Sequence, residues 1–251
     1  MMKNVTMHGM NDLPLDTAAR LQAIDRTLSV QFRPLSAVTS QPRERHADLA
    51  AAAPSEHANT LEALKSRVIQ EFPFTESLRG ATQPVFGEGD PNARLVLVGE
   101  APGADEDRTG RPFVGAAGQK LDQIIAAMGL SREAVYICNI LKARPPKNRT
   151  PLPDEVAANA PYLCEQLRLI APDVIVALGG SAAKFLLNTE TGITQLRGRW
   201  GAWTDPAGVS VLVMPTFHPA YLLRQYTPEV RGQMWADMQA VMDRLTQTAK
   251  V

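Results

Sequence analysis

Four short apolar runs alternate with helical stretches from residue 94 onward. The runs cover residues 95–99, 135–142, 174–178 and 209–214, and the helical stretches cover 116–128, 153–169, 181–187 and 229–246. Short buried strands separated by helices are typical of a parallel sheet covered on both faces. The sequence therefore predicts an α/β fold of the doubly wound class.

Candidate functional residues lie in the turns that follow these strands. In an open α/β sheet the turns line the carboxyl edge, and ligands bind in the crevice outside that edge. The predicted turns cover residues 99–115, 139–149, 179–181 and 215–224.

The first turn concentrates carboxylates directly after a strand. Gly99 ends the apolar run, and Glu100, Asp105, Glu106 and Asp107 follow closely. Carboxylates at this edge are candidates for acid–base chemistry. Taken alone, the cluster is explained equally well as a solvated acidic loop.

Basic residues gather in two stretches without acids, although the formal net charge of the chain is zero. Between residues 135 and 153 and between residues 191 and 204 the sequence carries Lys142, Arg144, Lys147, Arg149, Arg197, Arg199 and Trp200. Clustered cations beside an aromatic ring suit a nucleic-acid backbone. A solvated basic loop is the commoner explanation for any one of them.

The third turn places two glycines and a serine ahead of a helix. The backbone N–H groups of Gly180 and Ser181 are suited to face an anion such as a phosphate. Two-glycine turns also occur merely because they let a helix pack closely, and this explanation is equally well supported.

The fourth turn holds the only histidine outside the first 60 residues. His8, His46 and His57 lie in the N-terminal region, whereas His218 directly follows the last predicted strand. A lone histidine is more often structural than catalytic. Its position at the same edge as the acids favours a functional role.

The N-terminal region differs from the rest in composition. Residues 31–42 are polar with two prolines, and residues 43–60 are alanine-rich and weakly patterned. We therefore expect a flexible or partly helical extension over residues 1–60 and a folded domain over residues 61–251. A helix that caps this domain is expected over residues 61–72, where apolar residues share one face.

Nothing in the sequence indicates a membrane or secretory protein. No apolar run approaches the roughly 18 residues needed to span a bilayer, and residues 1–15 lack the features of a signal peptide. The two cysteines, Cys138 and Cys164, form neither a disulfide framework nor a metal-binding spacing, which fits a reducing compartment. We expect a cytoplasmic monomer.

Three segments together resemble the motifs of a known family. They are GEAPGADEDRTGRPFVGAAG at residues 99–118, CNILKARPP at 138–146 and TFHPAYLLR at 216–224. They are similar in order and spacing to the signatures of the family 4 uracil-DNA glycosylases, over residues 84–242. The resemblance implies a three-layer α/β/α domain with a four-stranded parallel sheet. It also implies a monofunctional DNA repair hydrolase that flips uracil out of DNA and cleaves its N-glycosidic bond, leaving an abasic site.

The resemblance assigns roles residue by residue. Phe113 matches the ring that stacks on uracil, Asn139 the amide that reads the base, and His218 the histidine beside the uracil carbonyl. An asparagine amide can pair with uracil O4 and N3–H, whereas cytosine presents the opposite pattern. A donor at uracil O2 and a carboxylate near the sugar and the water both lower the barrier to bond cleavage.

Further residues complete the implied site. Glu100, Glu106 and Asp107 match the family's acids. Which of them activates water stays open, because Ala101 repeats the family's lack of an aspartate two places after the first glycine. The implied base pocket is lined by Gly99, Ala101, Gly103, Phe113 and Asn139. The implied DNA contacts come from Lys142, Arg144, Gly180, Ser181, Arg197, Leu222 and Arg224.

The sequence departs from the resembled family in its cysteines. That family binds a [4Fe–4S] cluster through four of them, two before the first strand and two after the asparagine. Residues 71–89 contain no cysteine here, and the later positions hold Ala143 and Asn159. Because such a cluster needs four thiolates, we expect neither this cofactor nor another metal.

The expected partners are uracil-containing and abasic-site DNA, and two other functions compete with excision. One is non-catalytic binding of abasic or single-stranded DNA, which the missing cysteines and the basic loops favour. The other is a dinucleotide-binding oxidoreductase. GEAPG lacks the third glycine of the G-x-G-x-x-G fingerprint and argues against the oxidoreductase.

Overall fold

The computed structural model describes residues 54–205 and 208–248. Most of the predicted N-terminal extension therefore lies outside the described residues. The helix expected over residues 61–72 is present as α3 (Pro54–Glu71) and begins earlier than predicted. Its residues Leu61, Leu64 and Val68 are buried in the core, so the expected boundary at residue 61 falls within a helix of the folded domain.

A six-stranded sheet forms the centre of the molecule, in the order β1-β3-β2-β4-β6-β5. The strands are β1 (Glu88–Gly89), β2 (Leu95–Gly99), β3 (Tyr136–Asn139), β4 (Val174–Leu178), β5 (Gly201–Thr204) and β6 (Ser210–Thr216). The four inner strands are parallel, and β1 and β5 pair antiparallel at the two edges. The α/β class is confirmed, and the expected four parallel strands gain one short strand on each side.

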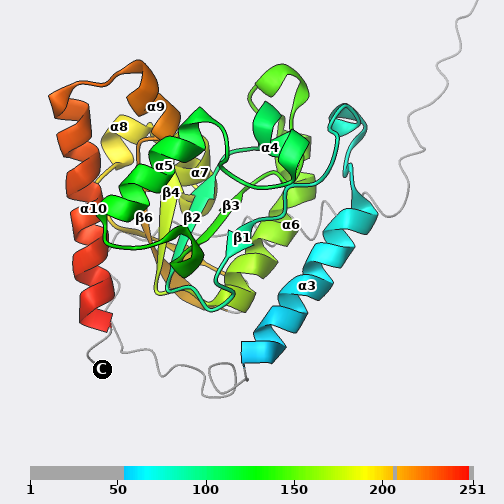
Figure 1. Cartoon of the computed structure of the whole chain (residues 1–251), viewed down its shortest axis with the longest axis horizontal. Helices are drawn as coiled ribbons and strands as arrows, with labels where there is room; N and C mark the ends of the chain where they lie inside the picture. Colours follow the sequence, from blue (N-terminus) through cyan, green and yellow to red (C-terminus); the bar gives the residue numbers. More distant parts are fainter. Residues whose placement is uncertain (1–53, 206–207, 249–251) are drawn as a thin grey trace, which may run out of the picture.

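Helices cover both faces of this sheet (Figure 1). The remaining helices are α4 (Ala104–Thr109), α5 (Ala116–Ala127), α6 (Pro153–Ile170), α7 (Gly180–Leu187), α8 (Ile193–Leu196), α9 (Pro219–Arg224) and α10 (Pro228–Thr248). Short 3-10 turns are η2 (Glu76–Leu78), η3 (Arg132–Ala134) and η4 (Pro146–Asn148). Helices α3, α6 and α7 share one apolar core with the sheet, whereas α5 and α10 share the other. No described helix is long and apolar enough to cross a bilayer.

Strand β2 illustrates why the strands read as continuous apolar runs. Val96 and Val98 belong to the core under α3, α6 and α7, whereas Leu95 and Leu97 belong to the core under α5 and α10. Side chains alternate across a strand, and both faces here are covered. Every residue of β2 is therefore buried.

The segment after α3 is tied to α6 by aromatic and ionic contacts. The Phe74 ring lies 5.4 Å from that of Tyr162, between centroids. Ser77 Oγ donates to Glu155 Oε1 at 2.6 Å, and Arg149 donates to both oxygens of the same carboxylate. The Arg149 guanidinium, with the Ser77 and Leu152 donors, holds the pKa of the buried Glu155 carboxyl at about 2. The carboxylate therefore stays ionised at neutral pH and links three chain segments.

Candidate active site

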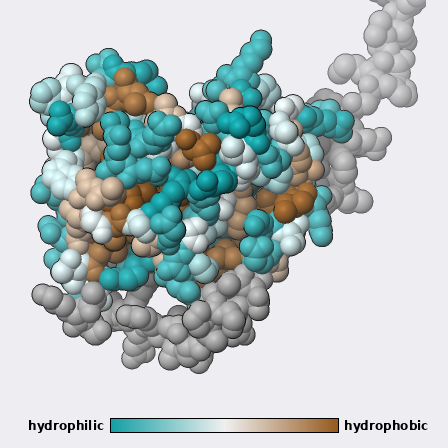
Figure 2. Space-filling view, viewed as in Figure 1, coloured by the Kyte–Doolittle hydropathy of each residue, from teal (hydrophilic) through white to brown (hydrophobic). Residues whose placement is uncertain are grey.

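The carboxyl ends of the parallel strands bring the predicted turns together. Gly99 at the end of β2 pairs in register with Asn139 at the end of β3, and Leu178 of β4 pairs with Thr216 of β6. Phe217 and His218 follow β6 directly. This edge forms a notch between α9 and the loop that precedes α6 (Figure 2).

Gly99, Phe113, Asn139 and His218 form one cluster at this edge, which we call the pocket cluster. A Cβ atom at Gly99 would lie 2.4 Å from Phe113 Cζ and 2.4 Å from Asn139 Oδ1, so the three residues are in contact. The Phe113 and His218 rings lie 5.6 Å apart between centroids and are tilted by 30°. The structure therefore unites the ring, the amide and the imidazole that the sequence singled out.

The Asn139 amide is poised for a ligand. The residue is only 1% exposed, and its Oδ1 has no hydrogen-bond partner among the described residues. An unsatisfied buried acceptor costs about 1–3 kcal/mol. A ligand N–H that enters the pocket cluster would satisfy this oxygen.

His218 caps helix α9 and is held in one protonation state. Its Nδ1 accepts a hydrogen bond from the backbone N–H of Ala220 at 3.1 Å, so the proton of the neutral ring is on Nε2. Burial, together with the nearby charge of Arg224, lowers the pKa of His218 to about 4 against the opposing effect of Glu106. At neutral pH the residue is therefore an uncharged Nε2–H donor.

The three candidate acids have different surroundings. Glu106 accepts from the backbone N–H groups of Val114 and Gly115 with Oε1 and from that of Gly103 with Oε2. Asp107 is buried, and its two oxygens accept from the backbone N–H and the hydroxyl of Thr82. Both acids thus hold backbone segments in place.

Glu100 is the candidate acid that keeps an oxygen free. It is half-buried, and the hydroxyl of Ser181 donates to its Oε2. Among the described residues no donor contacts its Oε1. Of the three acids, Glu100 is therefore the one with a carboxylate oxygen left available to a water molecule.

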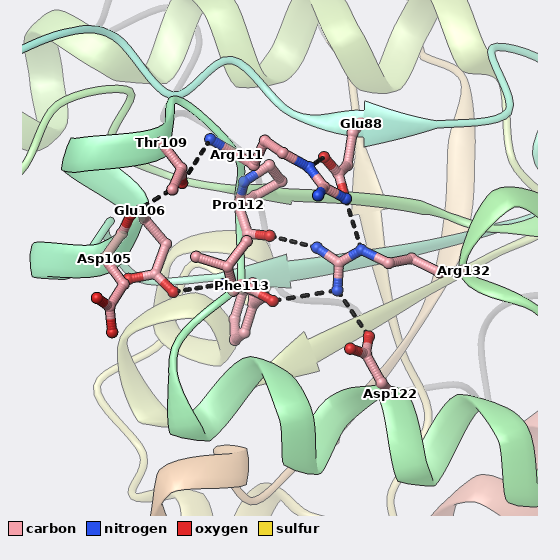
Figure 3. A network of polar contacts seen from close by, with 10 residues as sticks. Glu88, Asp105, Glu106, Thr109, Arg111, Pro112, Phe113, Asp122 and Arg132 are labelled. Atoms are coloured by element: carbon pink, nitrogen blue, oxygen red, sulfur yellow. Dashed lines mark hydrogen bonds and ion pairs between the residues drawn. The ribbon is translucent and has the colours of Figure 1, made fainter.

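Arg132 braces the backbone that carries Phe113 (Figure 3). Its guanidinium donates to the carbonyls of Phe113, at 3.1 Å, and Pro112. It also pairs with Glu88 and with Asp122. Phe113 has a φ of +43°, which costs energy for a residue with a side chain. Arg132 stabilises this turn through its hydrogen bonds to the two carbonyl groups.

The sequence did not indicate Arg132, because its partners are distant in the chain. Phe113 lies 19 residues away and Glu88 lies 44 residues away. Gly118 was also not singled out as a support of the Phe113 backbone, although a Cβ there would lie 1.9 Å from the Phe113 carbonyl oxygen. Only the tertiary arrangement identifies both.

Three predicted DNA contacts have side chains that the structure buries or pairs within the protein. Lys142 is fully buried, so its ammonium cannot reach a phosphate. Arg197 pairs with the buried Asp237, and its own side chain is only 17% exposed. Leu222 is 4% exposed, whereas the adjacent Leu223 is 47% exposed and is the leucine of α9 that faces solvent.

The other predicted contacts lie near the edge of the sheet. Gly180 and Ser181 begin α7, with Gly179 as the N-cap at a φ of +92°. Arg224 is exposed at the end of α9. Arg144 is half-buried and donates to Asn148 Oδ1 at 2.7 Å. These four residues stay predictions for DNA contact.

The residues present do not fit an iron–sulfur cluster. Ala143 is fully buried, and Asn159 uses its Oδ1 to accept from the Lys142 backbone N–H and its Nδ2 to donate to the Glu155 carbonyl. In residues 54–205 and 208–248 no group of three or more histidine, cysteine or acidic side chains is arranged to hold a metal.

The fold and the pocket cluster together define a class: α/β proteins in which an aromatic ring, an amide and an imidazole gather at the carboxyl edge of a parallel sheet. The sequence profile described as "Uracil DNA glycosylase superfamily" matches residues 86–239. The chain belongs to this superfamily.

Several curated relatives are similar to the chain. The Type-4 uracil-DNA glycosylase of Thermotoga maritima is 47% identical over 159 residues, which are 63% of this chain and 81% of the relative. The Type-4 enzyme of Archaeoglobus fulgidus is 44% identical over 170 residues, 64% of this chain and 81% of the relative. A Type-5 uracil-DNA glycosylase of Pyrobaculum aerophilum is 36% identical over 155 residues, 56% of this chain and 67% of the relative.

Replacing Arg132 should destabilise the protein much more than replacing Arg111. Both arginines pair with Glu88, but the Arg111 side chain is 60% exposed and that of Arg132 is 15% exposed. We expect Arg132→Gln to lower the free energy of unfolding by about 2–4 kcal/mol, because carbonyls and carboxylates lose a charged donor. Arg111→Gln should cost less than about 1 kcal/mol. Urea unfolding measures the free energy of unfolding of both variants. Equal losses would show that Arg132 does not stabilise the Phe113 turn more than an exposed ion pair would.

The His218 ring should titrate far below an ordinary histidine. Side-chain ¹⁵N NMR between neutral pH and the acid limit of stability should give a midpoint near 4, against the ordinary 6.5. Above that midpoint Nδ1 should carry the shift of an unprotonated acceptor. The spectrum of His218→Gln assigns the resonance. A midpoint at or above 6.5 would show that the ring is not held neutral.

Proposed function

We propose that this protein is a uracil-DNA glycosylase that removes uracil from DNA and leaves an abasic site. The carrying observation is the buried, unpartnered Asn139 Oδ1 beside Phe113 and Gly99. Uracil N3–H would donate to this oxygen, and the amide nitrogen would donate to uracil O4. Cytosine has an acceptor at N3 and an amine at C4, so it would leave both groups unpaired. Membership of the superfamily supports the same activity.

Uracil must leave the duplex to reach this pocket. Unpairing and unstacking cost a few kcal/mol, and a stacking ring recovers about 1–3 kcal/mol per base. Phe113 supplies that ring. Its turn is held by Arg132, which donates to the Phe113 carbonyl, and by Glu106, which accepts from the Val114 N–H. A preorganised ring loses little entropy when the base arrives.

Bond cleavage divides the charge between base and sugar. The N1–C1′ bond breaks with its electron pair staying on uracil, so the base becomes an anion and the sugar an oxocarbenium ion. His218 donates from Nε2 to uracil O2 as this charge develops. Glu100 orients a water whose oxygen bonds to C1′, and the carboxylate accepts the water proton. The anion is protonated on release.

The reaction would end at the abasic site. None of the four pocket-cluster residues carries an amine that could form a Schiff base with the sugar. We propose that Arg144, Arg224 and the N-terminus of α7 contact phosphates. Leu223, in place of Leu222, is the exposed leucine of α9 and is available to the DNA.

We further propose that the enzyme acts as a monomer in the cytoplasm. The two cysteines are free thiols, and burial raises the pKa of both Cys138 and Cys164. Unreactive free thiols are compatible with a reducing compartment.

Uracil excision is tested with a labelled oligonucleotide that contains one uracil, followed by alkaline cleavage of abasic sites. The parent protein should produce strand breaks at uracil and none at cytosine in the same sequence. Asn139→Ala should reduce the single-turnover rate by about 10²-fold or more, because the base loses its specific hydrogen bonds. Binding of abasic DNA without any cleavage would support the alternative of a non-catalytic binder. The free oxygen of Glu100 favours the enzyme.

We also propose that the activity needs no iron–sulfur cluster. The supporting observation is that Ala143 and Asn159 are packed and hydrogen-bonded where the resembled family has cysteines. Protein prepared without oxygen should excise uracil while containing less than about one tenth of an iron atom per chain and no visible absorption band. Stoichiometric iron would overturn this proposal and leave the excision result standing.

A further inference from the structure

Lys142 is a buried cation behind the residue that reads the base. It follows β3 by three positions, and its side chain is fully buried. Nζ donates to the main-chain carbonyl of Asn139 at 2.8 Å and to Gln166 Oε1. Gln166 in turn donates to the Phe86 carbonyl and to the Tyr136 hydroxyl. One hydrogen-bonded chain thus runs from the core to the end of β3.

The surroundings of this ammonium are uncharged. Among the residues whose side chains the structure describes, no carboxylate forms an ion pair with Lys142. The titratable groups that act on its charge are the Cys138 and Cys164 thiols, while the Tyr136 hydroxyl shares the partner Gln166; burial raises the pKa of each of the three. All three are therefore neutral at physiological pH. A buried charge without a counter-ion is costly and marks a functional candidate.

The charge is retained at neutral pH even so. Burial lowers the pKa of Lys142 to about 8, below the ordinary 10.5. Most of the ammonium is still protonated at pH 7 and loses its proton as the pH rises through 8. An apolar residue at this position would avoid the cost of removing the ammonium from water. We therefore expect the lysine to contribute to function.

We propose that Lys142 is a positioning and electrostatic residue that acts through Asn139 to stabilise the uracil anion as it leaves. This inference rests on the proposed function. The hydrogen bond to the Asn139 carbonyl fixes the peptide from which the base-reading amide projects. The positive charge lies behind that amide in a region from which water is excluded, where charges are weakly screened. Bound uracil is neutral, so the attraction grows mainly as the bond breaks, and it should affect the rate more than the binding.

The test varies the lysine and the leaving group together. Single-turnover rates at saturating enzyme are measured at neutral pH on DNA containing uracil or 5-fluorouracil, whose anion is intrinsically more stable. Lys142→Met should slow uracil release by about 10- to 100-fold and 5-fluorouracil release clearly less, because the better leaving group needs less help. Lys184→Met removes an exposed lysine that pairs with Glu190 and should leave both rates unchanged.

A purely structural role predicts a different pattern. If Lys142 only supports the fold, Lys142→Met should slow both substrates by the same factor, and that result would overturn the proposal. Affinity of Lys142→Met for abasic DNA should stay within about twofold of the parent, because the buried ammonium makes no phosphate contact. A large loss of affinity with an unchanged rate would also contradict the proposal.

The parent protein provides a second measurement if Lys142→Met does not fold. The single-turnover rate on uracil should fall as the pH rises through about 8, because the ammonium loses its proton. A rate that stays level through that range would overturn the proposal without the variant. If the parent cleaves neither substrate at any pH, the proposed function fails first, and abasic-DNA binding then decides between a binder and an inactive chain.

Discussion

The parallel pairing of β2 with β3 is the constraint on which the site depends. It sets Gly99 opposite Asn139, so the absence of a side chain at Gly99 leaves room for the Phe113 ring beside the Asn139 amide. A Cβ atom at Gly99 would overlap both. The Ile140 N–H then donates to the Gly99 carbonyl at 3.0 Å and extends the pairing past the end of the strand. The arrangement of the pocket cluster therefore follows from the register of β2 and β3.

Around Gly99 and Asn139, several polar groups are buried in a region of low dielectric, and their surroundings fix which of them are charged. His218 is neutral with its proton on Nε2, and Asn139 holds an acceptor without a partner. Lys142 holds a cation without a counter-ion. Such groups are costly in a core, but they are strong recognition elements when a base enters, since no water competes. Arg132, which donates to the Phe113 carbonyl, keeps the Phe113 turn rigid beside these groups.

The alternation of strands and helices, and the residues at the strand ends, could be predicted well from the sequence. Phe113, Asn139 and His218 were found through their motifs, and the structure brings them into one cluster. Whether a particular charged or apolar side chain is exposed to solvent could not be predicted as well. Lys142 and Arg197 look like phosphate contacts in a basic stretch, yet one is buried and the other is paired with Asp237.

The sequence by itself determined the class of fold, because the period of its apolar residues matches buried strands and helices. It also determined which residue types stand at the carboxyl edge, because those follow each strand directly. Only the tertiary structure decided which acid keeps a free oxygen, which leucine of α9 faces solvent, and that Arg132 braces Phe113. These properties depend on contacts between residues that are far apart in the chain, and local sequence patterns do not indicate such contacts.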